Sequence, residues 1–380
     1  MLYLHIFLLL FLLISELIVS NVKFTPTTVM LSIWLIIVGV CGFYEEYFWE
    51  LSDRTLSWIS FGCFAFFFGG ILGKLIARVK IDDVYVEAIP KIIYMPAYFI
   101  MFALFYFMTL SGAKEDDNWY IGIRKIINYG EPDWSFTGFG YLYYIIFPIL
   151  YISAVKYHSG NMSKSDRRMY ALHFTMCVIY SLMSTAKLKL LLAVVPVFFI
   201  RNYFKKVGIN RLIMILFFSI AVFFLSLFLL DKLSAGDDII DTFIFSVGNY
   251  TFFNVFAIDY LDFKPMLIGS CTENDTSCSI MPFFEFRNYK TNIYTVMYSF
   301  SEYGLTSYIL FQFLIGLVHN TVDKIARRTK NSLAIVFSSV LYVPLLFQIM
   351  DNQYTASKYM LYIMGVSYII YFIKSRRFVF

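Results

Sequence analysis

Two pairs of basic residues stand where they could hold a phosphate group. Lys187 and Lys189 interrupt a long apolar stretch, and a lysine near the middle of a membrane span costs about 2.5–3.5 kcal/mol to insert. Arg287 and Lys290 are three residues apart, a spacing at which two side chains share one helix face, and arginine grips phosphate oxygens in a bidentate manner. These pairs predict a cationic clamp for a lipid-linked phosphate. The alternative for the two lysines is that they extend to lipid headgroups.

Carboxylates in the late polar part of the chain are candidates for a general base that accepts a proton from a sugar hydroxyl. They are Asp259, Glu285 and Glu302. The alternative for each is a solvated or salt-bridged loop residue. No single one of them is favoured by the sequence.

Tyrosines are dense around Arg287, and their flat amphipathic rings suit stacking against sugars. The candidates are Tyr289, Tyr294 and Tyr298. Tyrosine is also the usual residue of a membrane interface belt, so packing at that interface is the alternative for each ring.

Other chemistries lack the residues they need. The polar segments expected on the outer side hold no cluster of His, Cys and Asp for a zinc hydrolase and no Ser-His-Asp arrangement. No glycine motif for nucleotide binding is present. We therefore expect no cofactor and no resident metal, although the acidic residues Glu115, Asp116 and Asp117 could still bind a cation.

Two further features bear on the environment of the chain. Glu16 stands alone in an apolar stretch, which predicts either a partner for a group that faces the helix bundle or a coupling residue. Cys271 and Cys278 are separated by six residues in a polar segment, which predicts a local disulfide in an oxidising compartment.

The composition requires a membrane to position these residues. Of the 380 residues, 59% are hydrophobic and 15% are charged, against about 25% charged residues in a soluble domain. This excludes a soluble enzyme and a nucleic-acid-binding domain. We count eleven candidate spans, at residues 2–20, 27–43, 57–79, 92–110, 139–155, 169–184, 188–200, 212–230, 300–318, 332–350 and 359–373. The expected fold is an all-α polytopic transmembrane bundle, with residues 1–380 forming a single integral membrane domain.

The charges between the spans predict their orientation. Alternate polar segments carry 20 of the 31 Lys and Arg residues, and by the positive-inside rule these segments face the cytoplasm. The basic segments that flank residues 169–200 must then lie on one side, so this stretch forms two short helices with a turn at 184–189. The segments 111–138 and 231–299 face outward.

Both outward segments are too long to be simple turns. The first, 111–138, predicts a short surface helix that carries Arg124 and Lys125, which join the candidate phosphate ligands. The second, 231–299, repeats apolar residues at intervals of three and four and predicts a helical periplasmic cap.

Several of these features together resemble the bacterial O-antigen (Wzy-type) polymerases. The resemblance rests on the many spans, the large late outer segment, the basic residues in STAKLKLLL at 184–192, and NIYTVMYSFSEYGLTSYILFQFLIGL at 292–317. It implies a glycosyltransferase of the bacterial inner membrane that moves a glycan from undecaprenyl pyrophosphate onto a lipid-linked repeat unit at the periplasmic face. It also implies essential basic residues in two outer segments, here Lys187 or Lys189 and Arg287, and an acidic residue at Glu302.

We therefore expect an oligosaccharide repeat unit polymerase whose partners are an undecaprenyl-pyrophosphate-linked oligosaccharide and membrane lipid. A chain-length regulator protein is a candidate partner, and nucleic acid is not expected. The alternatives are a flippase or exporter of lipid-linked oligosaccharide, and a ligase that passes the glycan to a lipid acceptor. Transporters usually show paired halves, and this sequence shows no duplication.

Overall fold

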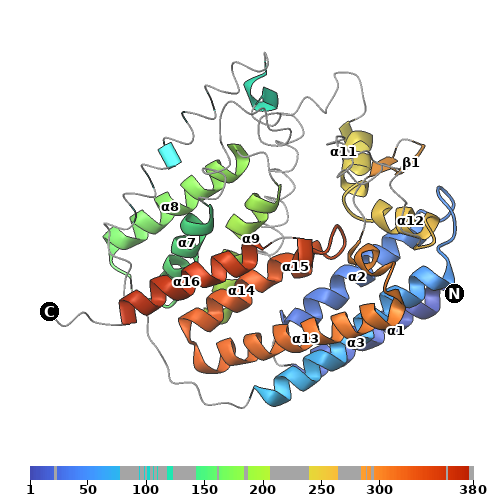
Figure 1. Ribbon diagram of the computed structural model, residues 1–380, viewed down its shortest axis with the longest axis horizontal. Coiled ribbons are helices and arrows are strands. Elements are labelled where there is room, and N and C mark those ends of the chain that lie inside the picture. The colour runs from blue at the N-terminus through green and yellow to red at the C-terminus, as the bar shows by residue number, and fades with distance from the viewer. Residues whose placement is uncertain are drawn as a thin grey trace. The chain divides into compact units, whose positions relative to one another are not determined.

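The computed structural model describes most of the chain. The described residues are 1–20, 24–77, 118–122, 143–160, 162–183, 187–205, 239–263, 284–287, 289–291, 295–356 and 358–375, together with 94, 98, 101, 102, 106 and 109. Nearly all regular structure in this part of the chain is helical (Figure 1). The expected helical fold class is therefore correct for the described residues, apart from one short β-hairpin.

The contacts within the chain divide it into two compact units. Unit 1 consists of residues 1–79, 238–325 and 344–357, and unit 2 of residues 80–237, 326–343 and 358–380. Each unit is discontinuous in sequence. The candidate residues between 259 and 302 belong to unit 1, and Lys187 and Lys189 belong to unit 2.

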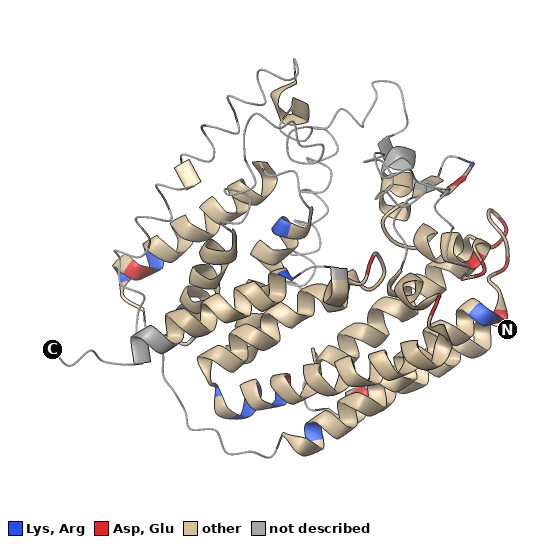
Figure 2. Cartoon of the chain, viewed as in Figure 1, with Lys and Arg blue, Asp and Glu red and all other residues tan. Residues whose placement is uncertain are grey.

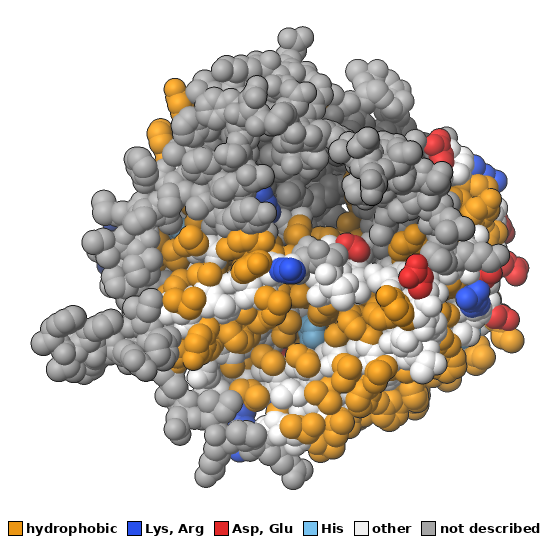
Figure 3. All heavy atoms as spheres, in the orientation of Figure 1, with side chains coloured by type: hydrophobic (Ala, Val, Ile, Leu, Met, Phe, Trp, Pro, Cys, Tyr) orange, Lys and Arg blue, Asp and Glu red, His pale blue; other side chains and the backbone are white. Residues whose placement is uncertain are grey.

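Four of the described helices are long and apolar enough to cross a membrane. They are α1 (Leu2–Val19), α2 (Pro26–Phe43), α3 (Asp53–Ile76) and α13 (Gly304–Thr329). The helix α14 (Ser332–Phe347) and the stretch Tyr359–Tyr371 are apolar but shorter. Large apolar side chains on α1, α3 and α13 remain exposed, and hydrophobic side chains gather over α13 in Figure 3. Exposed apolar side chains on long helices are typical of helices that face lipid.

Local sequence signals determine where α2 and α3 begin. Thr25 and Thr28 form a capping box, in which the Thr25 Oγ1 accepts from the Thr28 N–H at 3.1 Å and the Thr28 Oγ1 accepts from the Thr25 N–H at 2.8 Å. Pro26 follows in the first turn, where its missing N–H is not needed. Ser52 caps α3 and accepts from the Thr55 N–H at 3.2 Å.

Side-chain contacts show that α1 runs parallel to α3 and antiparallel to α2. The His5 Nδ1 lies 2.7 Å from the Ser60 Oγ, and further along both helices Glu16 pairs with Lys74. Glu16 also accepts from the Thr25 Oγ1 at the start of α2. The chain thus crosses the thickness of unit 1 three times in alternating directions, as the sequence predicts.

The helices α3 and α13 run parallel at very short range because glycines line their contact. A Cβ added to Gly69 would lie 2.1 Å from the Phe313 carbonyl oxygen, and one added to Gly73 would lie 2.5 Å from the Leu317 carbonyl oxygen. From the other side, a Cβ on Gly316 would meet the α3 backbone at 2.3 Å. Small residues four apart are the usual means of close helix packing in membranes.

The expected helical cap over 231–299 contains both helices and strands in its described part. The helices are α11 (Ile239–Gly248) and α12 (Phe253–Tyr260), and the short 3-10 helix η2 covers Val296–Phe300. The strands β1 (Phe284–Phe286) and β2 (Tyr289–Thr291) pair antiparallel, with Glu285 opposite Lys290. The expectation of a purely helical cap is corrected here, because residues 284–291 alternate with the period of two that suits a strand.

The two ends of unit 1 differ in charge. We call the end that carries the hairpin, the C-terminus of α2 and the N-termini of α3 and α13 the hairpin end. Acidic residues cluster there, whereas Lys74 and Lys324 lie on the opposite end of α3 and α13, which we call the basic end. Figure 2 shows blue segments at this far end of both helices and red segments around the hairpin end.

Unit 2 packs the helices α7 (Tyr143–His158), α8 (Lys164–Met183), α9 (Lys187–Phe204) and α16 (Tyr359–Ser375) together with most of α14. The helices α8 and α9 contact each other. The prediction that 169–200 forms two helices is therefore confirmed, but both arms are longer than expected. The pair Lys187 and Lys189 lies in the first turn of α9.

Candidate functional site

An aromatic core supports the hairpin end of unit 1. The ring centroid of Phe48 lies 4.6 Å from that of Phe256 and 5.0 Å from that of Tyr289. Tyr289 also lies 5.1 Å from Phe253, and it is only 1% exposed. Its ring belongs to the core, so the predicted glycan stacking by Tyr289 is corrected to a packing role.

Asp259 is the acceptor at the centre of a hydrogen-bond cluster. Its Oδ1 accepts from the Ser52 N–H at 3.1 Å, the Ser52 Oγ at 2.5 Å and the Thr55 Oγ1 at 2.6 Å. Its Oδ2 accepts from the Trp49 Nε1 at 2.9 Å. A carboxylate in this position holds the N-terminus of α3, where negative charge is favoured. Four donors thus already contact the two carboxylate oxygens of Asp259.

Arg287 occupies the turn of the hairpin and is exposed. Its φ of 53° lies in the left-handed region, and its guanidinium carbon lies 4.2 Å from the ring centroid of Tyr47 and 5.3 Å from that of Phe286. Stacking on these rings orients the guanidinium. Lys290 lies in strand β2, so the shared helix face that its spacing from Arg287 predicts is wrong.

The charge around Arg287 is mixed. The loop that carries Tyr47 also contains Glu45, Glu46 and Glu50. Burial, and then the carboxylate of Glu50, raise the pKa of Glu45. An anion at the hairpin would therefore depend on direct contact with Arg287, because the surrounding loop supplies no general positive field.

The other two candidate carboxylates are more accessible than Asp259. Glu285 is exposed in β1, and Glu302 is exposed two residues before Gly304, the first residue of α13. Tyr298 is half-buried in η2, and its carbonyl accepts from the Ser301 Oγ at 2.8 Å. Glu285, Arg287, Tyr298 and Glu302 all belong to the hairpin end of unit 1.

The remaining predicted site residues fall into two groups. The Nζ of Lys189 lies 5.3 Å from the ring centroid of Tyr180, and its carbonyl accepts from the Ser181 Oγ at 3.1 Å. Lys187 is the first residue of α9. Five predicted residues lie outside the described residues: Arg124, Lys125, Cys271, Cys278 and Tyr294. For Lys290 the structure describes the backbone and not the side chain.

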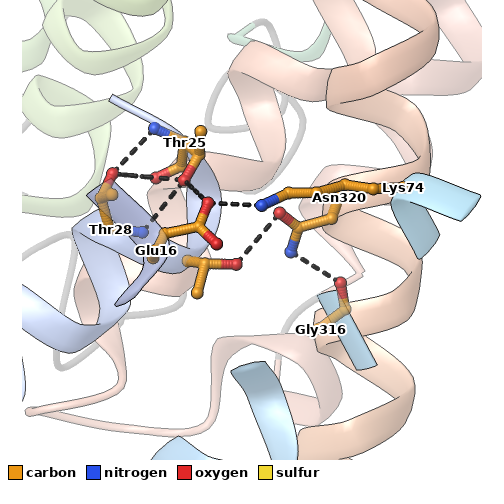
Figure 4. Close-up of polar contacts among 7 residues, drawn as sticks. Glu16, Thr25, Thr28, Lys74, Gly316 and Asn320 are labelled. Carbon is orange, nitrogen blue, oxygen red and sulfur yellow. Dashed lines mark hydrogen bonds and ion pairs between the residues drawn. The ribbon is translucent and has the colours of Figure 1, made fainter. Parts of the chain in front are cut away.

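Glu16 has the bundle-facing partner that one of its two interpretations requires. The carboxylate is 1% exposed, pairs with the Nζ of Lys74, and accepts from the Thr25 Oγ1 at 2.8 Å (Figure 4). Beside this pair, the Thr27 Oγ1 donates to the Asn320 Oδ1 at 3.0 Å. These contacts join α1, α2, α3 and α13, and they assign the cluster to helix association.

One polar cluster was not expected from the sequence. Residues 348–354, which we call the amide turn, follow α14 and run into the short helix α15 (Gln353–Ala356). They contain Gln348, Asp351, Asn352 and Gln353. They lie against α13, where the Gln312 Nε2 donates to the Gln348 Oε1 at 3.0 Å. The signal in the sequence is three amides and one carboxylate within residues 348–353, directly after an apolar stretch, a pattern that an exposed turn also shows.

Comparisons of the sequence with known protein families and with curated proteins, and of the structure with solved structures, find no match.

Proposed function

We propose that this chain is a membrane glycosyltransferase that lengthens an oligosaccharide on undecaprenyl pyrophosphate at the outer face of the bacterial inner membrane. The proposal rests mainly on the exposure and orientation of the Arg287 guanidinium. An exposed guanidinium stands at the tip of a hairpin, stacked on Tyr47, at the end of unit 1 opposite Lys74 and Lys324. By the positive-inside rule, Arg287 would then lie on the outer side.

The direction of the helices supports the proposed topology of about eleven spans. Since α3 and α13 run parallel, an odd number of crossings must separate them in sequence. Five candidate spans lie between them, at 92–110, 139–155, 169–184, 188–200 and 212–230. An even number there would place the basic segment after α13 on the opposite side from the one after α3.

The chemistry assigns separate roles to the charged groups. Cleavage of the anomeric bond leaves negative charge on the departing diphosphate, and the oriented guanidinium of Arg287 would stabilise this charge. The base that accepts the proton of the acceptor hydroxyl would be Glu285 or Glu302, because both carboxylates are exposed. Asp259 is the weaker candidate because four donors already occupy it. On unit 2, Lys187 and Lys189 would hold a lipid phosphate.

The length of the surface glycan tests this function. In the source bacterium, deletion of the gene should leave surface glycans of a single repeat unit, and the wild-type gene should restore long chains. Loss of all surface glycan, with intermediates on the cytoplasmic face, would instead show a flippase. Full-length polymer that stays on the lipid carrier would show a ligase. Either of these two results contradicts the proposal.

A further inference from the structure

The amide turn lies beside the middle of a membrane-spanning helix. Gln312, which bonds Gln348, and His319, whose Nε2 lies 2.7 Å from the Tyr354 Oη, are 8 and 15 residues after Gly304. At 1.5 Å per residue these contacts lie about 12 Å and about 22 Å along α13, which is about 39 Å long. Non-helical backbone at membrane depth occurs where it is buried in protein or lines a polar space.

Several buried polar side-chain atoms on or next to this turn have no hydrogen-bond partner among the described residues. The residues concerned are 8% exposed or less. The atoms are Thr295 Oγ1, Gln348 Nε2, Asn352 Oδ1, Asn352 Nδ2 and Gln353 Oε1. Buried polar atoms in native proteins are almost always paired, so a group of them points to a partner that the chain itself does not supply.

The kinds of atom present decide which ligand fits. Amides and a hydroxyl offer both donors and acceptors, whereas a phosphate needs donors and a metal ion needs acceptors alone. The carboxylate of Asp351 is already engaged, because it accepts from the Asn352 N–H at 2.6 Å and the Gln353 Nε2 at 2.8 Å. An uncharged group with several hydroxyls matches this set. The ring of Tyr354, 5.7 Å from that of Phe311, adds a flat apolar surface.

Hydrogen bonds connect the amide turn to the hairpin that carries Arg287. The Thr291 Oγ1 in β2 donates to the Asn254 Oδ1 at 2.9 Å. The Asn254 Nδ2 in turn donates to the Ile349 carbonyl at 3.1 Å. The Val296 N–H also donates to the Gln348 carbonyl at 2.8 Å. The turn is therefore continuous with the proposed outer site.

We propose that the amide turn binds a sugar residue, with Thr295, Gln348 and Asn352 as its hydrogen-bonding groups. The assignment of that sugar to the lipid-linked oligosaccharide rests on the proposed function. The turn would fix the glycan while Arg287 holds the diphosphate at the hairpin. Asn352 is the central residue of the proposal, since both polar atoms of its side chain lack a partner within the described chain.

Two matched pairs of variants test this site. Thr295→Val and Asn352→Leu remove groups that have no partner in the described chain, whereas Thr291→Val and Asn254→Leu remove groups that are hydrogen-bonded to each other. All four residues are buried. The full-length proteins, in lipid nanodiscs, are titrated with the free oligosaccharide repeat unit released from the source bacterium and, separately, with undecaprenyl pyrophosphate that carries no sugar. Binding and melting temperature are measured.

We expect Asn352→Leu and Thr295→Val to keep the melting temperature and to weaken oligosaccharide binding by up to about tenfold, the loss of one ordinary hydrogen bond. Thr291→Val should melt at a lower temperature and bind the oligosaccharide as the wild type does. Absence of oligosaccharide binding to the wild type, or unchanged binding in both test variants, overturns the sugar site. A fall in melting temperature in Asn352→Leu as large as in Asn254→Leu also overturns it, because the amide would then serve the fold through buried water.

Titration with undecaprenyl pyrophosphate tests the diphosphate clamp of the proposed function separately from the sugar site at the amide turn. Undecaprenyl pyrophosphate should bind equally to the wild type and to Asn352→Leu, and more weakly to Arg287→Ala. If Arg287→Ala leaves that binding unchanged, the diphosphate clamp is wrong, yet oligosaccharide binding at the amide turn can still be scored.

Discussion

Arg287 combines an unfavourable backbone conformation with an exposed charge. A left-handed φ costs a non-glycine residue about 1 kcal/mol, which glycine avoids, so the backbone geometry of this turn does not by itself favour arginine. The ring of Tyr47 beneath the guanidinium supplies orientation. We regard this strained, stacked arginine as the residue on which the proposed activity depends.

The first prediction separates stability from activity at this residue. Arg287→Gly should keep or raise the melting temperature, because it relieves the φ of 53°, while glycan extension falls by at least about 100-fold, as for removal of one preorganised donor. Arg287→Lys should recover part of the activity, since it restores the charge without the bidentate geometry. Full activity in the glycine variant would exclude a role in catalysis.

The buried ion pair makes a different prediction. Lys74→Met leaves the carboxylate of Glu16, which is 1% exposed, without its cation, and breaking such a pair destabilises by about 3–5 kcal/mol. The double variant Glu16→Gln, Lys74→Met should recover much of this loss, as measured by thermal unfolding. If the double variant is no more stable than Lys74→Met, the two side chains do not depend on one another.

The pH dependence of stability should report on the amide turn. Burial raises the pKa of Asp351, so the folded protein binds this proton more tightly than the unfolded chain does. Its contribution is then fully present below the unfolded pKa, about 3.9, and is lost as the pH rises through the folded pKa. Asp351→Asn should therefore reduce the decrease in melting temperature that accompanies this rise in pH. If the melting temperature of Asp351→Asn depends on pH as that of the wild type does, the titration of Asp351 is not the cause of the pH dependence.

Among the elements, the contact of α3 with α13 is the most sensitive to side-chain size. Gly69→Ala would place a Cβ 2.1 Å from the Phe313 carbonyl oxygen, where the obstacle is backbone and cannot move aside cheaply. We expect a loss of about 1–3 kcal/mol, the usual range for overpacking. Gly39→Ala in α2 is the matched control, because a Cβ at Gly39 meets nothing within 4 Å. Equal melting temperatures in the two variants would refute the close approach.

The sequence predicts the elements that depend on local signals better than those that depend on contacts between distant residues. Helices such as α2 follow from local signals, a capping box and an uninterrupted apolar stretch, and the two-helix solution for 169–200 follows from charge parity. The hairpin at 284–291 was missed because the three-residue spacing of Arg287 and Lys290 satisfies a helix as well as a strand pair. Tyr289 was misassigned for a related reason: only the tertiary packing of Phe48 and Phe253 shows that its ring is buried.

The sequence reveals the charged residues of the candidate site, but it does not reveal which of its side chains are buried. Arg287, Glu285 and Glu302 could be selected from the sequence because they are charged. The partners of Asp259 and Glu16 could not be predicted, because they come from segments tens to hundreds of residues away. The amide turn was missed for the same reason. A run of polar residues after α14 indicates an exposed turn unless the depth of its contacts on α13 is known.

The whole molecule combines an apolar helical bundle with a hairpin that presents an exposed arginine. The chain offers four helices, within its described residues, that are long and apolar enough to cross a membrane. Acidic residues cluster at the hairpin end of unit 1, whereas Lys74 and Lys324 lie at the opposite end. The proposed outer-face transfer between lipid carriers needs the apolar helices for the carrier tail and the exposed Arg287 for its diphosphate.

The most direct test is extension of a lipid carrier by the purified protein. The wild type and Arg287→Ala are reconstituted separately in vesicles with the undecaprenyl-pyrophosphate-linked repeat unit and without nucleotide sugar, and the carrier-bound products are sized by mass spectrometry. We predict carriers with two or more repeat units for the wild type and carriers with one repeat unit for Arg287→Ala. Products of a single repeat unit from a folded wild-type protein, or equally long products from both proteins, would contradict the account.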